Sequence, residues 1–208
     1  MAAQREVVTT IDLLRHGACE GGEIYRGRTD VVLSSEGWQQ MEQATATPAN
    51  WQSVVTSPLQ RCRTFAEHCA SRFQIPLQVV TDFREMDFGD WEGRLLKEVW
   101  RSEAQTVSAF YDDPSAVTPP GGEPTVMVQE RVAAAWQALV QQCAGQHLLL
   151  VCHGGVIRLL LGHLLNMPLA TIARLHIPYA SISRIQVYQS EGREFPVLMS
   201  LNASCDPL

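Results

Sequence analysis

The sequence predicts an α/β fold in which helices cover the faces of a mostly parallel β-sheet. Short apolar runs alternate along the chain with longer segments of helical periodicity, the pattern of strand–helix–strand units. Hydrophobic residues make up 46% and charged residues 18% of the 208 residues, the balance of a packed globular protein. A chain of this length fits one compact domain. We therefore expect residues 1–208 to form a single domain, with residues 82–124 as a lid or loop-rich insert.

The first half of the chain is predicted to contain three strands and two helices. Residues 7–14 are β-branched and apolar, which favours a buried strand. A glycine-rich loop follows over residues 17–27, and the Ser-Ser-Glu-Gly of residues 34–37 then indicates the start of a helix, with a hydroxyl residue free to cap it. The remaining predicted elements of this half are a strand at residues 53–56, a helix that Ser57 caps and that runs from Pro58 to about residue 72, and a strand at residues 77–81.

The second half is predicted to alternate loops and helices before a closing pair of strands. Residues 82–93 are dense in charge, aromatic rings and Gly, and residues 113–124 hold four Pro, so we expect loops in both. Apolar residues recur at helical spacing over residues 123–144, and the run Leu-Leu-Leu-Val in residues 147–152 is typical of a central parallel strand. The other predicted elements are helices at residues 95–111 and 154–166, and strands at residues 182–188 and 196–202.

The charged residues argue against several classes of function. The formal net charge of −6 argues against a general nucleic-acid-binding face. Of the 16 basic side chains only Lys97 is a lysine, and its neighbours Leu and Glu are not those of a P-loop, so Walker-type nucleotide hydrolysis is excluded. The chain has no run of about 18 apolar residues, so we predict no membrane-spanning helix and no membrane partner.

The start of the chain and its cysteines indicate a cytoplasmic protein. Residues 1–6 are not followed by the apolar core and cleavage site of a signal peptide. No two cysteines form a C-x-x-C pair, which predicts free, mostly buried thiols and no zinc site. The six cysteines are Cys19, Cys62, Cys69, Cys143, Cys152 and Cys205. The oligomeric state stays open between monomer and dimer.

Two of the predicted strands end in a histidine followed by glycine. The first ends in Leu-Arg-His-Gly, which contains Arg15 and His16, and a later one in Val-Cys-His-Gly-Gly, which contains His153 and Gly154. Ligands of open α/β sheets bind at the carboxyl ends of the strands. Arg61 lies just past the second strand, and arginine guanidinium groups match the geometry of phosphate oxygens. We therefore predict that Arg15, His16, Arg61 and His153 form a phosphoryl pocket.

A histidine in such a pocket can also act as a nucleophile. A neutral imidazole nitrogen can attack phosphorus and form a phosphohistidine, while an acceptor at the other nitrogen fixes the tautomer. Two arginines and a second histidine can supply the positive charge that the transition state requires without a metal. The leaving alkoxide needs a proton. One of the four carboxylates in residues 84–93, partly desolvated near Phe88 or Trp91, could have a raised pKa and act as the general acid.

These residues belong to an ordered set of motifs that resembles the histidine phosphatase superfamily, which includes the phosphoglycerate mutases. An Arg-His-Gly tripeptide alone is a weak signal, but five segments in the right order span almost the whole chain. They are Arg15-His16-Gly17, Tyr25-Arg26-Gly27 with Leu33 to Gly37, Ser57-Pro58-Leu59-Gln60-Arg61 with Thr64, Glu85 to Gly93, and Val151-Cys152-His153-Gly154-Gly155. The resemblance implies a three-layer α/β/α sandwich of the phosphoglycerate mutase type.

The resemblance also implies roles for individual residues. It makes His16 the phosphate acceptor and Glu85 the proton donor, and it makes the remaining carboxylates of that loop structural. It implies that Arg15, Arg61, His153 and the backbone at Gly154 bind the phosphoryl group, that His153 takes part in catalysis, and that no metal or cofactor is needed. The reaction then has two steps, which are transfer to His16 with protonation of the alcohol and attack of water on the phosphohistidine.

Two positions depart from the family pattern. Cys19 and Gly22 stand where the family often has Thr or Ser and Asn, side chains that commonly help to hold the phosphate. We therefore expect phosphate binding here to depend more on backbone amides or on Arg15 and Arg61.

The motifs say less about the alcohol part of the substrate, which we expect to contact residues 95–123. The short chain lacks the insertion of the cofactor-dependent mutases, and residues 88–92, 119–123 and 166–168 look like those of the alpha-ribazole phosphatase branch of cobalamin synthesis. We therefore favour hydrolysis of alpha-ribazole 5'-phosphate, a small phosphorylated substrate. A broad-specificity phosphatase, a phosphoglycerate mutase and a non-catalytic phosphate sensor stay open as alternatives.

Overall fold

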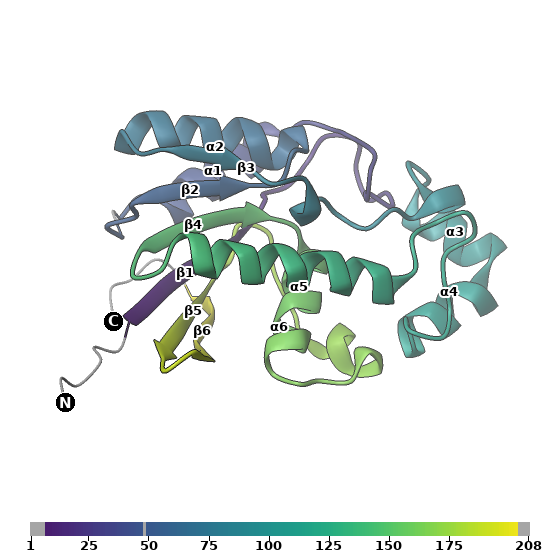
Figure 1. Ribbon diagram of the computed structural model, residues 1–208. Helices are drawn as coiled ribbons and strands as arrows, with labels where there is room; N and C mark the ends of the chain where they lie inside the picture. Colours follow the sequence, from purple (N-terminus) through teal and green to yellow (C-terminus); the bar gives the residue numbers. More distant parts are fainter. Residues whose placement is uncertain (1–6, 48, 204–208) are drawn as a thin grey trace.

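The computed structural model describes residues 7–47 and 49–203, and a six-stranded sheet of order β3-β2-β4-β1-β5-β6 lies at its centre (Figure 1). Strands β3, β2, β4 and β1 run parallel, whereas β5 and β6 are antiparallel to their neighbours. The strands are β1 (Val7–Arg15), β2 (Ser53–Thr56), β3 (Leu77–Val79), β4 (His147–Cys152), β5 (Ile182–Ser190) and β6 (Arg193–Ala203). The predicted α/β fold with a mostly parallel sheet is confirmed.

Helices cover both faces of the sheet, with α1 and α2 on one side and α5 and α6 on the other (Figure 1). The described helices are α1 (Ser35–Ala44), α2 (Gln60–Phe73), α3 (Leu96–Ser102), α4 (Ala104–Asp112), α5 (Thr125–Gln142) and α6 (Gly154–Leu164), with short 3-10 helices η1 (Thr81–Phe83), η2 (Gly89–Trp91) and η3 (Leu169–Arg174). This is the predicted three-layer sandwich. The sequence analysis did not predict η3.

Strand β4 is apolar on both faces because it lies between two cores. Leu148 and Leu150 pack in the core that includes α5 and α6, whereas Leu149 and Val151 pack in the core that includes α1 and α2. Side chains alternate along a strand, so a central parallel strand needs an unbroken apolar run to fill both cores.

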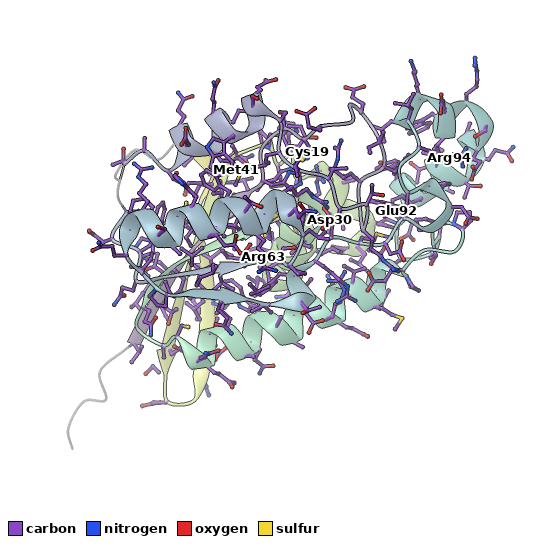
Figure 2. All side chains as sticks on the ribbon, turned by 90° about the horizontal axis from the view of Figure 1, so that it is seen from above. Cys19, Asp30, Met41, Arg63, Glu92 and Arg94 are labelled. Carbon is purple, nitrogen blue, oxygen red and sulfur yellow. The ribbon has the colours of Figure 1, made fainter. Side chains whose placement is uncertain are left out.

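The predicted start of α2 is wrong. The helix begins at Gln60 and not at Pro58, and the Ser57 hydroxyl does not cap it. The backbone N–H of Gln60 instead donates to Asp30 Oδ1 at 2.8 Å, and Figure 2 shows Asp30 beside this end of α2. A carboxylate from a loop thirty residues earlier thus satisfies a free N–H of the first turn, which no local sequence signal could indicate.

The predicted helix at residues 95–111 is two helices, because the chain bends at Glu103. This residue has φ −136°, outside the helical range, between α3 and α4. Its carboxylate accepts hydrogen bonds from Trp91 Nε1 at 2.8 Å and Arg94 Nη1 at 2.7 Å. These contacts hold Glu103 against the preceding loop and set the angle at which α4 leaves α3.

Residues 82–124 lie beyond the carboxyl ends of the parallel strands and contain α3 and α4 (Figure 1). Their buried side chains, such as Trp91, Val99 and Phe110, belong to the same apolar core as Ile11 of β1. The segment therefore packs on the body of the fold and covers the edge of the sheet at which ligands of α/β proteins bind.

The cysteines of the described residues are all free thiols. Four are buried and Cys19 is half-buried, whereas Cys205 lies outside the described residues. In the part of the chain that the structure describes, no helix has the length and apolar character to cross a membrane. The same residues contain no group of three or more His, Cys, Asp or Glu side chains placed to hold a metal ion.

A buried carboxylate links the middle of the sheet to three neighbouring elements. Asp12 of β1 has no exposed surface, and its oxygens accept hydrogen bonds from Trp51 Nε1 at 2.8 Å and Arg184 Nε at 2.7 Å. His147 Nε2 lies 2.9 Å from Asp12 Oδ2. Burial raises the pKa of Asp12, but the hydrogen bonds from His147, Arg184 and Trp51 outweigh burial, so its pKa is lowered.

We expect Asp12→Asn to destabilise the protein strongly, because one amide oxygen cannot replace a carboxylate that serves three donor groups. Breaking a buried ion pair typically costs about 3–5 kcal/mol, so the free energy of unfolding should fall by about 3 kcal/mol or more. For a chain of this size this corresponds to a Tm lower by roughly 6–12 °C, measurable by calorimetry. The control is Asp112→Asn at the exposed end of α4. A loss below about 1 kcal/mol in Asp12→Asn would contradict a structural role for this network.

Candidate active site

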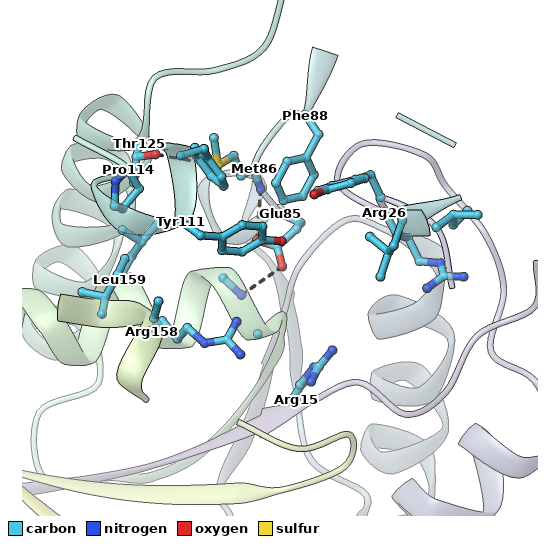
Figure 3. A pocket seen from close by; sticks show the side chains of 18 of the residues that line it. Arg15, Arg26, Glu85, Met86, Phe88, Tyr111, Pro114, Thr125, Arg158 and Leu159 are labelled. Atoms are coloured by element: carbon cyan, nitrogen blue, oxygen red, sulfur yellow. Dashed lines mark hydrogen bonds between the residues drawn. The ribbon is translucent and has the colours of Figure 1, made fainter. Parts of the chain in front are cut away.

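The carboxyl ends of β1 and β4 bring the two predicted histidines together. Arg15 pairs with Cys152 across these parallel strands, so His16 and His153 follow at the same edge of the sheet. Their ring centroids are 5.3 Å apart. A cavity of about 380 Å³ opens at this edge, and Figure 3 shows Arg15, Glu85 and Arg158 directed into it. Four of the predicted site residues, Arg15, His16, Glu85 and Gly154, line this cavity.

His16 has the geometry of a neutral nucleophile. Its Nδ1 lies 2.8 Å from the carbonyl oxygen of Gly17, which can only accept, so Nδ1 carries the proton and Nε2 keeps its lone pair. The pKa of His16 is well below its usual value, because the ring is buried and because the cations Arg61, Arg15 and Arg26 lie nearby. The hydrogen bond to the Gly17 carbonyl raises the pKa, but by less than these effects lower it. The backbone therefore fixes the tautomer, and the surroundings keep the ring uncharged.

His153 is fully buried behind His16. Arg61 Nε donates to its Nδ1 at 3.3 Å, so the proton of the neutral ring lies on Nε2, which donates to Ser57 Oγ at 2.7 Å. Burial and then the charge of Arg61 hold the pKa of His153 well below its usual value. In this structure His153 does not line the cavity. Its ring instead packs beside His16 and connects it to Arg61.

Arg61 lies next to His153, and its donors are occupied by groups of the protein itself. It is buried, and its guanidinium donates to the carbonyl oxygens of Gly27 at 2.8 Å and Thr29 at 3.0 Å, in addition to His153. It does not line the cavity. Its charge lowers the pKa values of both histidines, and its hydrogen bonds hold the loop that carries Arg26. A direct contact between Arg61 and phosphate stays a prediction.

Two other arginines, which line the cavity, each have a buried donor without a partner. Arg15 Nε and Arg26 Nε are buried and make no hydrogen bond within the described chain, and both residues line the cavity. Arg15 Nη1 donates to the carbonyl of Ile177 at 2.5 Å, and Arg15 Cζ lies 4.0 Å from the centroid of the Tyr179 ring. Arg26 Nη2 donates to the carbonyl of Gly22 at 2.8 Å. Buried donors are rarely left without partners, so these two are suited to an anionic ligand.

Arg26 and Tyr179 line the cavity but were not among the predicted site residues. Arg26 lies in the Tyr-Arg-Gly motif, and its position in a glycine-rich loop of an arginine-rich chain is the sequence signal that could have indicated it. Tyr179 lies outside every motif, and only the approach of its loop to β1 places its ring 5.7 Å from that of His16.

Two backbone donors hold Glu85 beside the start of α6. The N–H groups of Gly155 and Met86 each donate to its carboxylate at 3.1 Å, and the residue is 7% exposed (Figure 3). This contact explains the second glycine after His153, because a Cβ at Gly155 would lie 2.5 Å from Glu85 Oε1. A Cβ at Gly154 would likewise lie 3.1 Å from Arg15 Nε. Because neither glycine has a Cβ, the carboxylate of Glu85 and the guanidinium of Arg15 can both approach the start of α6.

The other carboxylates of the Glu85 loop make structural contacts, as the resemblance implies. Glu92 accepts hydrogen bonds from the backbone N–H groups of Arg28 at 2.8 Å and Thr29 at 2.9 Å, so it fixes the loop that Arg61 also holds. Asp87 pairs with Arg28 at 2.7 Å. Neither Glu92 nor Asp87 lines the cavity.

Cys19 and Gly22, the two positions that depart from the family pattern, both lie next to residues of the site. Cys19 Sγ lies 3.6 Å from His16 Nδ1 and outside the cavity lining, and burial raises its pKa, so the thiol stays neutral. Gly22 has φ +71°, and its carbonyl accepts from Arg26 Nη2. At this position a backbone carbonyl therefore orients an arginine, in place of the side chain that is common in the family.

The rest of the cavity is mainly apolar. The region at residues 95–123 contributes Leu96, Phe110, Tyr111 and Pro114, as predicted. Other parts of the wall come from the Glu85 loop, α6 and η3, and their contribution was not predicted. These side chains are Met86, Phe88, Leu159, Ile172 and Ala173. Arg158 adds a cation, with Nε donating to the carbonyl of Leu175 at 2.8 Å.

We expect His16 to stay neutral at pH values at which an ordinary histidine is half protonated. Titration of the imidazole ¹⁵N signals should show the Nδ1–H tautomer at pH 6.5 and protonation only at clearly lower pH. Because the unfolded chain takes up protons near pH 6.5 and folded His16 and His153 do not, their contribution to the free energy of unfolding rises with pH up to that value. A His16 signal that titrates at pH 6.5 or above would contradict this environment.

Comparison with known proteins agrees with the geometry. Residues 11–198 match the model of the histidine phosphatase superfamily (branch 1). A bifunctional protein of Mycobacterium tuberculosis is 33% identical over 189 residues, which are 88% of this chain and 52% of that protein. The chain thus spans about half the length of the mycobacterial relatives at this level of identity.

Two further relatives match over nearly their whole length. The adenosylcobalamin/alpha-ribazole phosphatase of Escherichia coli is 28% identical over 195 residues, 92% of this chain and 94% of that protein. The solved structure of mycobacterial glucosyl-3-phosphoglycerate phosphatase has a TM-score of 0.85 at 26% identity, covering 94% of this chain and 99% of that chain. The fold implied by the motifs is therefore confirmed.

Proposed function

Because the chain belongs to the histidine phosphatase superfamily (branch 1), we propose that it hydrolyses phosphomonoesters through a phosphohistidine at His16. One observation carries this proposal. A neutral imidazole, with its proton fixed on Nδ1, faces a cavity that also holds two buried guanidinium donors without partners. This arrangement supports both nucleophilic attack and stabilisation of the phosphoryl charge.

In the first step, the lone pair of His16 Nε2 attacks phosphorus, and the bond from phosphorus to the alcohol oxygen breaks. Arg15 and Arg26 bind the non-bridging oxygens through their free Nε–H groups, while Arg61 and His153 act from behind the ring. A proton from the Glu85 carboxyl group passes to the departing alkoxide, so the alcohol leaves in neutral form. The backbone at Gly154, which lines the cavity, completes the proposed phosphoryl site. A direct contact from His153 stays a prediction, because Arg61 and Ser57 bind its two ring nitrogens in this structure.

In the second step, water attacks the phosphohistidine from the side that the alcohol has left. Glu85, now a carboxylate, accepts a proton from the water, the N–P bond breaks, and its electron pair returns to His16 Nε2. Inorganic phosphate and the original enzyme result. Every positive charge that these steps require comes from side chains of the chain itself, so we propose that the reaction needs no metal.

For the substrate, we propose alpha-ribazole 5'-phosphate. The Escherichia coli relative that matches over most of both chains is an adenosylcobalamin/alpha-ribazole phosphatase. The wall formed by Phe88, Phe110, Tyr111 and Leu159 is aromatic and aliphatic, which suits a heteroaromatic base better than a sugar.

A second candidate is a sugar-linked phosphoglycerate. It is favoured by Arg158, because a cation in the alcohol half of the cavity could pair with the carboxylate of a glycerate. The mycobacterial phosphatase with the same fold acts on glucosyl-3-phosphoglycerate, according to its name. A broad-specificity phosphatase and a mutase are the remaining alternatives.

A hydrolysis panel in the presence of EDTA tests these assignments. It compares alpha-ribazole 5'-phosphate, glucosyl-3-phosphoglycerate, 3-phosphoglycerate, a sugar phosphate and p-nitrophenyl phosphate. We expect kcat/KM for alpha-ribazole 5'-phosphate to exceed that for the others by about 100-fold, which corresponds to about 2.8 kcal/mol. Similar values for all five would indicate a broad-specificity enzyme, and activity that returns only with added Mg²⁺ or Zn²⁺ would contradict the metal-free mechanism.

A further inference from the structure

We propose that Arg131 of α5 is a positioning residue for the proton donor of the reaction, because its guanidinium holds the backbone that carries Glu85. The inference rests on the proposed function, in which Glu85 protonates the leaving alcohol, and it names the side chain that keeps the carboxyl group within reach of that alcohol. Arg131 does not line the cavity, so it acts through Glu85 and not on the substrate.

The guanidinium of Arg131 makes one hydrogen bond for each of its five N–H groups. Nη1 donates to the carbonyl oxygens of Asp82 at 2.6 Å and Arg84 at 2.9 Å, and Nη2 donates to that of Glu85 at 3.3 Å. Nε and Nη2 donate to the two carboxylate oxygens of Glu123 at 2.8 Å and 2.9 Å. Three carbonyls of one short segment, including that of the proposed acid, therefore converge on one side chain of α5.

Glu123 fixes the orientation of this guanidinium. The side chains of Arg131 and Glu123 are only 11% and 18% exposed. Burial raises the pKa of Glu123, but the hydrogen bond and the charge of Arg131 outweigh burial, so its pKa is lowered and the carboxylate stays charged. A bidentate pair of arginine and carboxylate has a defined plane, which here faces the backbone before Glu85. A lysine has three donors and no planar fork, so it could not make the same set of contacts.

The Pro-Gly-Gly-Glu run of residues 119–123 holds the same loop beyond Glu85. The backbone N–H of Glu123 donates to the carbonyl oxygen of Asp87 at 2.9 Å. A Cβ at Gly122 would lie 2.7 Å from that carbonyl oxygen, so glycine permits the close approach of the two segments. The loop that carries the proton donor is therefore fixed on both sides of Glu85.

Proton transfer depends on the position of this loop. The Glu85 carboxylate is bound by the backbone N–H of Met86, which belongs to the same loop, and by that of Gly155 at the start of α6. A shift of the loop therefore moves the carboxyl group relative to His16 and to an alcohol oxygen in the cavity. A displacement of about 1 Å can reduce the rate of such a step by about 100-fold.

The test compares an alkyl phosphate with p-nitrophenyl phosphate in Arg131→Met, which removes all five donors and keeps an unbranched side chain. We expect kcat/KM for the alkyl ester to fall by about 10–100-fold. The loss for p-nitrophenyl phosphate should be less than about threefold, because nitrophenolate leaves without a proton. The parameter kcat/KM is used because it reports the steps up to phosphoryl transfer to His16.

A second variant keeps the guanidinium and changes its partner. Glu123→Gln preserves the size of the side chain but removes the charge that orients Arg131, so it should show the same selective loss at about 3–10-fold. The matched control is Arg63→Met on α2 (Figure 2). It removes another arginine whose Nε donates to a glutamate, Glu67, at 2.8 Å, and it should keep wild-type values for both esters.

The outcomes distinguish this inference from the proposed function. If the wild type hydrolyses neither ester, the proposed function is wrong and the inference falls with it. If Glu85→Gln loses activity selectively on the alkyl ester but folded Arg131→Met loses it equally on both esters, or on neither, Glu85 remains the acid and the role of Arg131 is overturned. Where Arg131→Met does not fold, the same comparison in Glu123→Gln decides between these results.

Discussion

Replacing His16 with Ala or Asn is expected to reduce turnover by roughly 10⁴-fold or more, because the residue supplies the only attacking atom of the proposed first step. The substitution should leave the fold intact, since the hydrogen-bond contacts of the His16 ring are local, through Nδ1 to the Gly17 carbonyl and the Cys19 thiol. Steady-state hydrolysis of p-nitrophenyl phosphate measures the loss. His163→Asn at the exposed end of α6 serves as the matched control and should retain full activity.

Chemical trapping tests the same step directly. Wild-type enzyme quenched during turnover of a ³²P-labelled ester should carry a label that is labile to acid and stable to base, and His16→Ala should carry none. A non-catalytic phosphate sensor would show neither turnover nor label in either protein. Turnover in the wild type without a labelled histidine at saturating substrate would contradict the covalent mechanism.

Replacing Glu85 with Gln is expected to lower kcat for an alkyl phosphate by about 10²–10⁴-fold, the usual contribution of a general acid. Glutamine keeps the length of the side chain and an oxygen that can accept from Gly155 N–H, but it cannot deliver a proton to an alkoxide. The loss should be far smaller for p-nitrophenyl phosphate, because nitrophenolate leaves without protonation. The measurement is therefore the ratio of the two losses.

A carboxylate of the same loop provides the control for this second prediction. Asp90 is exposed, so Asp90→Asn should change neither rate by more than about threefold. Equal losses for both esters in Glu85→Gln would mean that Glu85 orders the site without protonating the leaving group. The acid would then have to be sought elsewhere in the cavity.

Elements whose position depends on local interactions could be predicted from the sequence, whereas boundaries set by distant groups could not. The strands were predicted well because a run such as Leu-Leu-Leu-Val reflects burial on both faces, which the sequence states directly. The errors arose where a distant group determines the geometry. Asp30 sets the start of α2, and Trp91 and Arg94 bend the chain at Glu103. Neither set of contacts changes the hydrophobic periodicity of the segment whose boundary it determines, so the sequence pattern does not reveal it.

The site divides in the same way. His16 and His153 could be placed together from the sequence, because parallel strands that end in His-Gly deliver both rings to one edge of the sheet. The contacts of Arg61 could not, because the Gly27 and Thr29 carbonyls that occupy its donors lie more than thirty residues earlier in the chain. The unpartnered donors of Arg15 and Arg26 likewise emerge only after every contact has been assigned.

The sequence by itself determined the alternation of strands and helices, the edge of the sheet at which the site lies and the two histidines that meet there, since each of these follows from residue type and spacing along the chain. Tertiary structure alone decided the protonated nitrogen of each histidine, the arginines that remain free for a ligand and the reason for the glycines beside Glu85. These features depend on hydrogen bonds and close approaches between segments far apart in sequence, and such contacts exist only once the chain has folded.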